Sequence, residues 1–421
     1  MKKIVYASVI VGTLLSCGKQ DPKEITEVKK QFVAVDGIDN SIKPGDNFFR
    51  YVNGIWYDTA QIADDQVGVG SYMFLNIPQK KRLEGILEDV SSHEYPEGSV
   101  EQKVGDFYAS GMDTTVINKR GYQPIQPILD DIESIQNESE LLTFVAKEIK
   151  TGNSSIIRFG VYPNTENSSI NILHFGQSGL GLPDRDYYFK TDSSTIEIQS
   201  AYKEYIKTLF ELTGSDADVA KKQADEVYGI EKELAAAHKT RIERREIKSN
   251  YHNMTVAEAD AKYPNLALAK ILQDLELETD TIDMAQLEYF EKLNSMLPSV
   301  SLSGWKTYLK AHTLSEYANI LSEPFENAAF SYSKVISGQS TQKPLKQRMV
   351  EKTDRMLGFA LGQLYVEKYF SEEAKKRALE LVENIKKSLD HRITKLEWMS
   401  DSTKIKAKEK LQAITQKSRI S

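Results

Sequence analysis

Cysteine is nearly absent from this sequence, because Cys17 is the only one among 421 residues. A single cysteine cannot form an internal disulfide, so the stability of the fold must come from packing. The sequence also lacks an H-E-x-x-H motif, which supplies two zinc-ligand histidines one helical turn apart and a catalytic glutamate. It has no G-x-S-x-G elbow and no G-x-x-x-x-G-K phosphate loop. These absences predict no catalytic residue in this chain.

Histidine is scarce as well, with six residues, whereas a catalytic zinc takes three protein ligands. His93 begins the string H-E-Y-P-E, but Glu97 stands where the second histidine belongs, and Pro96 would disrupt a helical turn, so we expect a loop. His312 and Glu316 are one helical turn apart, which favours a pair on a helix surface. The other four are isolated and are expected to have structural or surface roles: His174, His238, His252 and His391. We therefore predict no metal ligand and no cofactor in this chain.

Neither sign of charge dominates, since 54 Lys and Arg against 61 Asp and Glu give a formal net charge of −7. The two signs are interspersed, which argues against binding of a phosphate backbone, and we expect no nucleic-acid partner. Residues 17–40 are short of aromatics and rich in Lys, Glu and Asp, which indicates a solvated polar tether. The roughly 380 residues that follow are enough for a sizeable core.

The N-terminal apolar run, Ile4–Leu15, is shorter than the ~20 residues that span a bilayer. Two lysines precede it, and Leu14-Leu15-Ser16-Cys17 ends it with the spacing of a bacterial lipobox. We predict that residues 1–16 are a signal peptide that is removed and that Cys17 is the lipid attachment site. The lipid anchor would hold the protein on a membrane of the bacterial cell envelope, periplasmic or at the cell surface. An ordinary secretory signal with a stray cysteine is the alternative.

Helical periodicity is strongest near the C-terminus. Seven apolar residues recur there at spacings of three or four and share one helix face: Ala374, Ala378, Leu381, Ile385, Leu389, Ile393 and Leu396. Ser371 precedes two glutamates and predicts a helix N-cap, and Ser400 predicts the start of a further helix in the same way. An earlier helical stretch runs over Tyr202–Arg245 and is interrupted by Gly214.

The exception to helix lies between Ser155 and Phe175. SIIRFGVY and INILHF are short, β-branched and aromatic, and the turn formers PNTENSS separate them, so we predict a β-hairpin. Its second strand leads into Gly176–Asp186, where Gly179, Gly181 and Pro183 exclude regular helix or strand.

The segment QSGLGLPDRDYY, Gln177–Tyr188, is an idiosyncratic string that composition alone would not produce. Four further distinctive segments flank it in order: PGDNFFRYVNGIW (Pro44–Trp56), IEKELAAAHKTRIERREIKSNYHNMT (Ile230–Thr255), ALGQLYVEKYFSEEAKKRALELVENIK (Ala360–Lys386) and LEWMSDSTKIKAKEKLQAI (Leu396–Ile414). Together they resemble the N-terminal domain of the neprilysin and endothelin-converting-enzyme family of zinc metalloendopeptidases.

The resemblance implies a mainly α fold, in which residues 41–415 form a multi-helical cap domain with a small β-hairpin. In the family this domain encloses a substrate chamber for oligopeptides, and a zinc domain follows it. Here TQKSRIS departs from the family pattern at about Gln416. We therefore expect residues 416–421 to be a divergent, truncated end and the C-terminal zinc domain to be absent. Zinc is expected in the intact family member, and a separately encoded zinc catalytic domain is the expected partner.

No substrate-binding residue can be assigned from the sequence. Arg185 and Asp186 could contact substrate, but we favour a pair of Arg185 with a carboxylate and an Asp186 side chain that caps a turn. Four charged residues could line a chamber or form a solvated, charge-paired helix end: Arg241, Glu243, Arg244 and Arg245. In the resembling family, an arginine after the opening helix is associated with the substrate's terminal carboxylate, and here Gly68 stands at that position and Met73 at the following aspartate.

Three functions are compatible with these features. The first is the substrate-enclosing domain of a neprilysin-like endopeptidase, inactive alone. The second is a non-catalytic lipoprotein that binds peptides or a partner protein at the cell envelope. The third, a helical lipoprotein that gathers nutrients such as glycans, disagrees with the family segments. The first function also predicts an unmatched apolar face near the last helix, around Trp398–Ile414, where a catalytic domain would dock.

Overall fold

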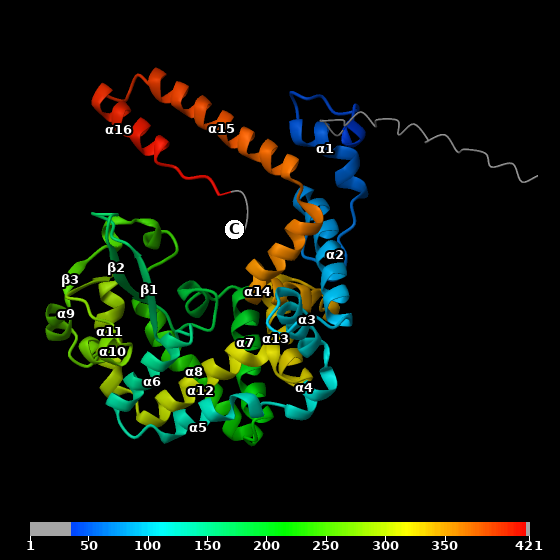
Figure 1. Ribbon diagram of the computed structural model, residues 1–421. Coiled ribbons are helices and arrows are strands. Elements are labelled where there is room, and N and C mark those ends of the chain that lie inside the picture. The colour runs from blue at the N-terminus through cyan, green and yellow to red at the C-terminus, as the bar shows by residue number, and fades with distance from the viewer. Residues whose placement is uncertain (1–34, 418–421) are drawn as a thin grey trace, which may run out of the picture. The chain divides into compact units, whose positions relative to one another are not determined.

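The computed structural model of the protein describes residues 35–417, which form two compact units divided between Gln61 and Ile62 (Figure 1). The first unit holds the short 3₁₀-helix η1 (Val35–Gly37) and helix α1 (Phe48–Thr59). The Asn47 side chain accepts a hydrogen bond from Arg50 N and caps α1. A Cβ at Gly54 would meet the Asp39 side chain at 2.7 Å, so this close approach needs glycine. Helix α1 thus covers most of the segment Pro44–Trp56 that carries the family resemblance.

In the second unit, α2 (Ser71–Ser92), α3 (Val100–Met112) and α14 (Leu345–Tyr369) pack around a core of their own. Ten buried side chains fill it: Leu83, Ile86, Leu87, Val90, Val104, Tyr108, Met349, Val350, Leu361 and Leu364. Helix α14 is kinked at Leu357, where the backbone leaves helical geometry. Segments far apart in the sequence thus share one apolar cluster, which fixes α14 against α2 and α3 (Figure 1).

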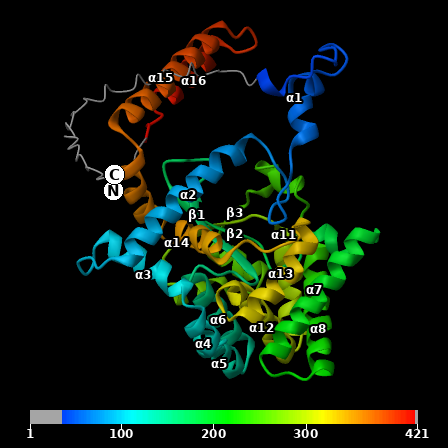
Figure 2. The same cartoon turned by 90° about the vertical axis from the view of Figure 1, so that its right-hand side faces the viewer.

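A larger core lies among the helices from α5 to α13 and buries several large aromatic side chains, including Trp305, Tyr289 and Phe290. These helices are α5 (Gln126–Ser134), α6 (Glu138–Lys150), α7 (Ser193–Leu212), α8 (Ala217–Ala237), α9 (Val256–Lys262), α10 (Leu268–Asp274), α11 (Leu287–Ser299), α12 (Leu302–Tyr317) and α13 (Glu323–Ser337), and α4 (Thr114–Arg120) precedes them without a buried residue. Helix α7 contacts α8, α12 and α13, and the four lie together in Figure 2.

A four-stranded sheet in the order β1-β2-β4-β3 packs with this core. Strands β1 (Ile157–Pro163) and β2 (Asn171–Gln177) form the predicted antiparallel hairpin. Strand β4 (Thr281–Met284) runs parallel to β2, and β3 (Asn253–Thr255) pairs antiparallel with β4. The hairpin is confirmed, but β3 and β4 were not predicted, because strands this short leave no periodicity of their own.

The predicted helical stretch Tyr202–Arg245 is two helices, as expected from Gly214, which lies between α7 and α8 at φ +100°. Its C-terminal boundary is wrong, because α8 ends at Ala237 and a turn without α-helix follows. The turn contains the 3₁₀-helices η4 (Glu243–Arg245) and η5 (Lys248–Asn250). This early end places the basic residues after Ala237 beside the sheet rather than along a helix.

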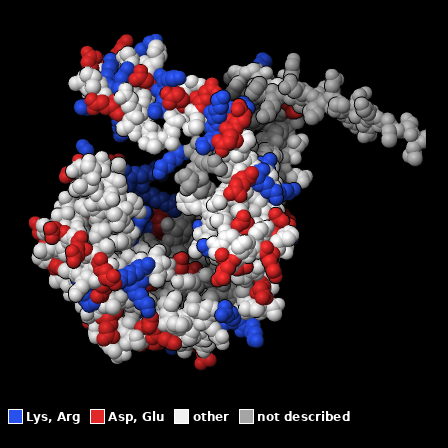
Figure 3. Space-filling view, in the orientation of Figure 1, with Lys and Arg blue, Asp and Glu red and all other residues white. Residues whose placement is uncertain are grey.

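Helices α15 (Glu372–Lys395) and α16 (Asp401–Gln412) form a hairpin, and their N-caps Ser371 and Ser400 are confirmed by side-chain bonds to Ala374 N and Thr403 N. The apolar positions of α15 share a face, but of those seven residues only Ile393 is buried. Exposed fractions are 62% at Leu381, 58% at Ile385 and 78% at Trp398. Within the predicted region Trp398–Ile414, the apolar side chains Trp398, Ile405 and Ile414 are exposed, and exposed apolar positions continue onto α15; Figure 3 shows an uncharged strip on this hairpin.

Among residues 35–417, no helix is both long and apolar enough to cross a bilayer. The predicted signal peptide, residues 1–16, and the predicted lipid attachment site Cys17 lie outside the described residues, as do residues 418–421.

Candidate functional site

The segment Gln177–Tyr188, called here the signature loop, leaves the end of β2 and closes with the 3₁₀-helix η3 (Arg185–Tyr188). Two of its glycines are required by their surroundings. Gly179 has φ +91°, and an added Cβ would lie 2.6 Å from the Tyr308 hydroxyl. A Cβ on Gly181 would overlap the Tyr202 hydroxyl. Larger residues at these two positions would collide with tyrosine side chains, so the loop can pack directly against Tyr308 and Tyr202.

Tyrosine hydroxyl groups hold the signature loop from below. Tyr308 donates to Gly179 O at 2.9 Å, and Tyr332 donates to Gly181 O at 3.1 Å. The Tyr188 hydroxyl accepts from Leu182 N at 3.1 Å. Each bond satisfies a backbone group that no helix or strand serves, so the irregular loop keeps one conformation.

Two of the tyrosines beside the loop, Tyr188 and Tyr202, donate to Glu231 of α8, whose side chain is fully buried. Its carboxylate accepts from Tyr188 at 2.9 Å, from Tyr202 at 2.6 Å and from His312 Nε2 at 2.9 Å. Burial, and next the negative charge of Glu231, raise the pKa of Tyr188 and Tyr202 well above the usual value, so both hydroxyls remain donors. The prediction that His312 forms a surface pair with Glu316 is wrong, because His312 points inward to Glu231.

Sequence reasoning did not single out Glu231. It follows the apolar positions Val227 and Ile230 of α8 and lies next to the buried stripe, where a glutamate is expected only if it has buried donors. The sequence shows the position, but the donors come from α7, α12 and the signature loop. Only the packing of these elements brings them to one carboxylate.

The start of the signature loop is fixed by His238. The neutral ring donates from Nε2 to Ser178 O at 3.0 Å and accepts the Gln177 side-chain amide at Nδ1, 3.1 Å away. Burial, with a further contribution from the cations Arg244 and Arg185, lowers the pKa of His238 to about 4. His238 is therefore uncharged at neutral pH, as this hydrogen-bond pattern requires.

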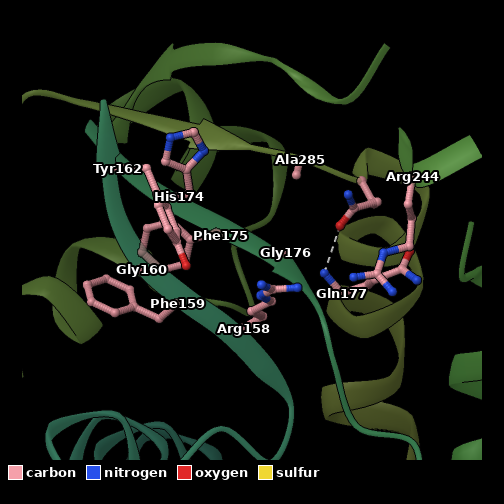
Figure 4. A pocket seen from close by; sticks show the side chains of 11 residues that line it. Arg158, Phe159, Gly160, Tyr162, His174, Phe175, Gly176, Gln177, Arg244 and Ala285 are labelled. Carbon is pink, nitrogen blue, oxygen red and sulfur yellow. Dashed lines mark hydrogen bonds between the residues drawn. The ribbon is translucent and has the colours of Figure 1, made fainter. Parts of the chain in front are cut away.

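Two adjoining cavities of about 170 Å³ each lie beside the loop and share Gln177 and Arg244 in their walls. The first lies against the hairpin and is lined by Arg158, His174 and Tyr162, among others (Figure 4). The second lies along the signature loop between Ser178 and Arg185. Five cationic residues line the two cavities: Arg158, Arg185, Lys239, Arg241 and Arg244. Figure 3 shows basic side chains gathered in a recess beside the sheet.

Three of these cations have carboxylate partners. Arg241 Nε lies 2.7 Å from Asp184 Oδ2, Arg185 Nη1 lies 3.7 Å from Asp186 Oδ1, and Lys239 Nζ lies 3.9 Å from Glu288 Oε2. The expected carboxylate pair of Arg185 is thus present. The expected cap is different, because the Asp184 side chain, not that of Asp186, accepts from the backbone at the start of η3.

Arg158 and Arg244 differ from the other three cations, because neither has an ion-pair partner within residues 35–417. Glu243 does not neutralise its neighbour, since its carboxylate accepts from Thr240 N and Oγ1 at 2.8 Å each. Of the two interpretations of Arg241–Arg245, a cavity lining describes Arg241 and Arg244, while Glu243 and Arg245 belong to an exposed turn.

No group of three or more His, Cys, Asp and Glu side chains that could hold a metal ion occurs within residues 35–417. The histidines are held apart by other partners: His174 by Asp283 at 2.6 Å, His252 by Met284 O at 3.0 Å, His238 by the signature loop and His312 by Glu231. His93 is the C-cap residue that follows α2, and residues 93–99 form the expected loop before α3. The described residues do not fit a catalytic zinc site.

The fold and this site define a mainly helical domain with a loop-lined cationic recess, and comparison with known proteins assigns it to a family. Residues 44–420 match the family model for the N-terminal domain of peptidase family M13, and the chain belongs to this family. It is 26% identical over 419 residues to endothelin-converting enzyme-like 1 of Rattus norvegicus, with 95% of this chain and 53% of the relative covered.

Solved structures agree with this assignment. The zinc metalloprotease Zmp1 of Mycobacterium tuberculosis has a TM-score of 0.81 and 26% identity, with 90% of this chain and 58% of that chain covered. PepO from Lactobacillus rhamnosis has a TM-score of 0.77 at 18% identity and supports the fold alone. The chain spans about half the length of the curated relatives it matches. The predicted family and the mainly helical fold with its small sheet are confirmed.

Proposed function

We propose that this chain supplies the domain that encloses oligopeptide substrates in a zinc endopeptidase of family M13. Peptide-bond hydrolysis would be performed by a zinc-binding catalytic half that completes the enzyme. The observation that carries this proposal is the cationic recess beside the signature loop, in a domain that matches the family from residue 44 to 420. A rigid loop with basic walls can orient the polar groups of an extended peptide.

Binding and hydrolysis by the full chain test this proposal. We expect fluorescent oligopeptides to bind saturably, as measured by anisotropy, and to remain uncleaved with or without added zinc, because the sequence holds no H-E-x-x-H motif. Chelator-sensitive cleavage would overturn the division of labour between the two halves. Absence of binding to every peptide in a varied set would overturn the substrate-enclosing role.

We also propose that the catalytic half docks on the apolar strip of α15 and α16. The strip consists of Leu381, Ile385 and Leu389 on α15 with Ile405 on α16, all exposed. Contiguous apolar surface beyond roughly a few hundred Å² marks interaction sites in soluble proteins. A coexpressed polypeptide that carries the family's zinc domain should copurify with the wild-type chain and be lost with a Leu381→Lys, Ile385→Lys double variant. Equal recovery with both chains would exclude this surface.

Lipid attachment at Cys17 and localisation at the bacterial cell envelope remain part of the proposal. They rest on the basic start, the apolar run and the lipobox spacing of the sequence. Mass spectrometry of the membrane-extracted protein should show an acylated Cys17 as the mature N-terminus. A soluble protein cut at another residue would contradict the anchor.

A further inference from the structure

The unpaired arginines Arg158 and Arg244 come from distant parts of the chain and line the same cavity. Arg158 projects from β1, and Arg244 lies in η4, after α8. Figure 4 shows both side chains extending toward Gln177 from different sides. Both side chains are exposed, so water solvates them, but two guanidinium groups at one cavity without a carboxylate partner give it a positive potential that favours negative charge.

The stem of Arg158 and the backbone of Arg244 are held by their surroundings. Arg158 is paired with Gly176 in the β1–β2 register, and a Cβ on Gly176 would lie 3.8 Å from Arg158 Cβ and 3.9 Å from Cδ. The stem of Arg158 therefore runs across a residue that has no side chain. The backbone of Arg244 is held by a hydrogen bond from its N–H to Thr240 O at 3.0 Å. Holding the Arg158 stem and the Arg244 backbone reduces the freedom that these residues lose when they bind an anion.

The cavity wall between the arginines is formed by Gln177 and Gln286 and adds no negative charge. Gln177 N donates to Gln286 Oε1 at 2.9 Å, and the Gln177 side chain is bound to His238 and to the backbone of Lys239. Gln177 and Gln286 are both buried and neutral. No Asp or Glu within residues 35–417 lines this cavity; Asp184 lines the adjoining one and is paired with Arg241, and Asp283 is engaged by His174 and His252 N, each at 2.6 Å.

We propose that the cavity between Arg158 and Arg244 binds a carboxylate group of a peptide. This inference rests on the proposed function and names the chemistry of the group that the recess selects. Guanidinium forks match carboxylates in geometry as well as charge. At about 170 Å³ the cavity is smaller than the ~300–1,000 Å³ of pockets for whole small molecules, so it takes one acidic side chain or one chain end.

The carboxylate has two possible sources, and the same recognition serves both. An Asp or Glu side chain would enter the cavity while the peptide continues along the signature loop through the adjoining cavity, which shares Arg244. A C-terminal carboxylate would instead end the peptide at Arg158.

Three matched peptides separate the two sources in an anisotropy titration of the full chain. One has a glutamate and an amidated end, one has a free C-terminal carboxylate and no acidic side chain, and one is neutral and amidated. We expect at least one carboxylate peptide to bind ~10-fold or more tightly than the neutral peptide, as charge-assisted hydrogen bonds require. The preferred peptide identifies the source. Rising salt should reduce the preference.

Arg158→Gln and Arg244→Gln should each remove most of this preference and leave affinity for the neutral peptide unchanged. Arg245→Gln is the matched control, because Arg245 lies on the same exposed turn and lines neither cavity. Arg158→Lys keeps the charge and should show an intermediate preference. Circular dichroism confirms the fold of each variant.

Equal binding of the three peptides, or a preference that survives both Gln substitutions, would overturn the carboxylate site while the substrate-enclosing role stands. Failure of all three to bind would overturn both proposals, and the two cases are therefore distinguishable.

Discussion

The buried carboxyl of Glu148 predicts a stability change between mildly acidic and neutral pH. Glu148 lies on α6 with its side chain inside the protein, and Ser155 Oγ donates to it. Burial, only partly offset by the Ser155 hydrogen bond, raises its pKa from the ordinary 4.5 to about 7. The folded protein therefore binds a proton more tightly than the unfolded chain at this residue.

The sign of the pH dependence follows from proton linkage. Between pH 4.5 and 7 the folded state retains the Glu148 proton that the unfolded state releases, so the free energy of unfolding falls as pH rises through this window. At about 1.4 kcal/mol for each pH unit, the loss amounts to roughly 3 kcal/mol by pH 8. Glu148→Gln has no proton to lose and keeps an acceptor for Ser155.

Urea denaturation followed by circular dichroism at pH 4.5, 6 and 8 measures this effect. The variant should gain roughly 3 kcal/mol over the wild type between the lowest and the highest pH. His238, whose pKa is lowered to about 4, adds stability as pH rises from 4 to 6.5, but it is present in both proteins and cancels from the difference. Glu138→Gln, exposed on the same helix, is the control. A difference between wild type and variant that does not change with pH would refute the buried, protonated Glu148.

Three further outcomes are expected. Gly181→Ala should lower the melting temperature by several degrees, since its Cβ would overlap the Tyr202 hydroxyl, and an unchanged value would show that the signature loop adapts. Leu87→Ala, at a side chain with no exposed surface, should cost about 2–5 kcal/mol in urea denaturation, and a cost below 1 would contradict the packed core of α2, α3 and α14. Leu381→Lys should leave stability within about 0.5 kcal/mol in urea denaturation, because this side chain is exposed, whereas a large loss of stability would mean that the strip is buried.

Several errors of the sequence interpretation have one physical origin. His312 and Glu316 are one turn apart on α12, but the His312 ring binds Glu231 of the neighbouring helix α8. A buried carboxylate needs such a donor, whereas a solvated partner can be satisfied by water. The strands β3 and β4 are likewise visible only through their pairing, because β4 joins β2 in parallel across more than a hundred residues. Periodicity describes neighbours along one element and carries no information on contacts between elements.

The sequence by itself determined what depends on local chemistry. Ser371 and Ser400 begin helices because their hydroxyls satisfy free N–H groups. Two short β-branched and aromatic runs, separated by turn formers between Ser155 and Phe175, give a hairpin. The signature loop could be placed after that hairpin, and the family could be identified from its residues. Only the tertiary structure decided which charges meet. Arg158 and Arg244 line one cavity, Glu231 gathers three donors, and the apolar face of α15 stays exposed, because each depends on elements that the chain brings together from a distance.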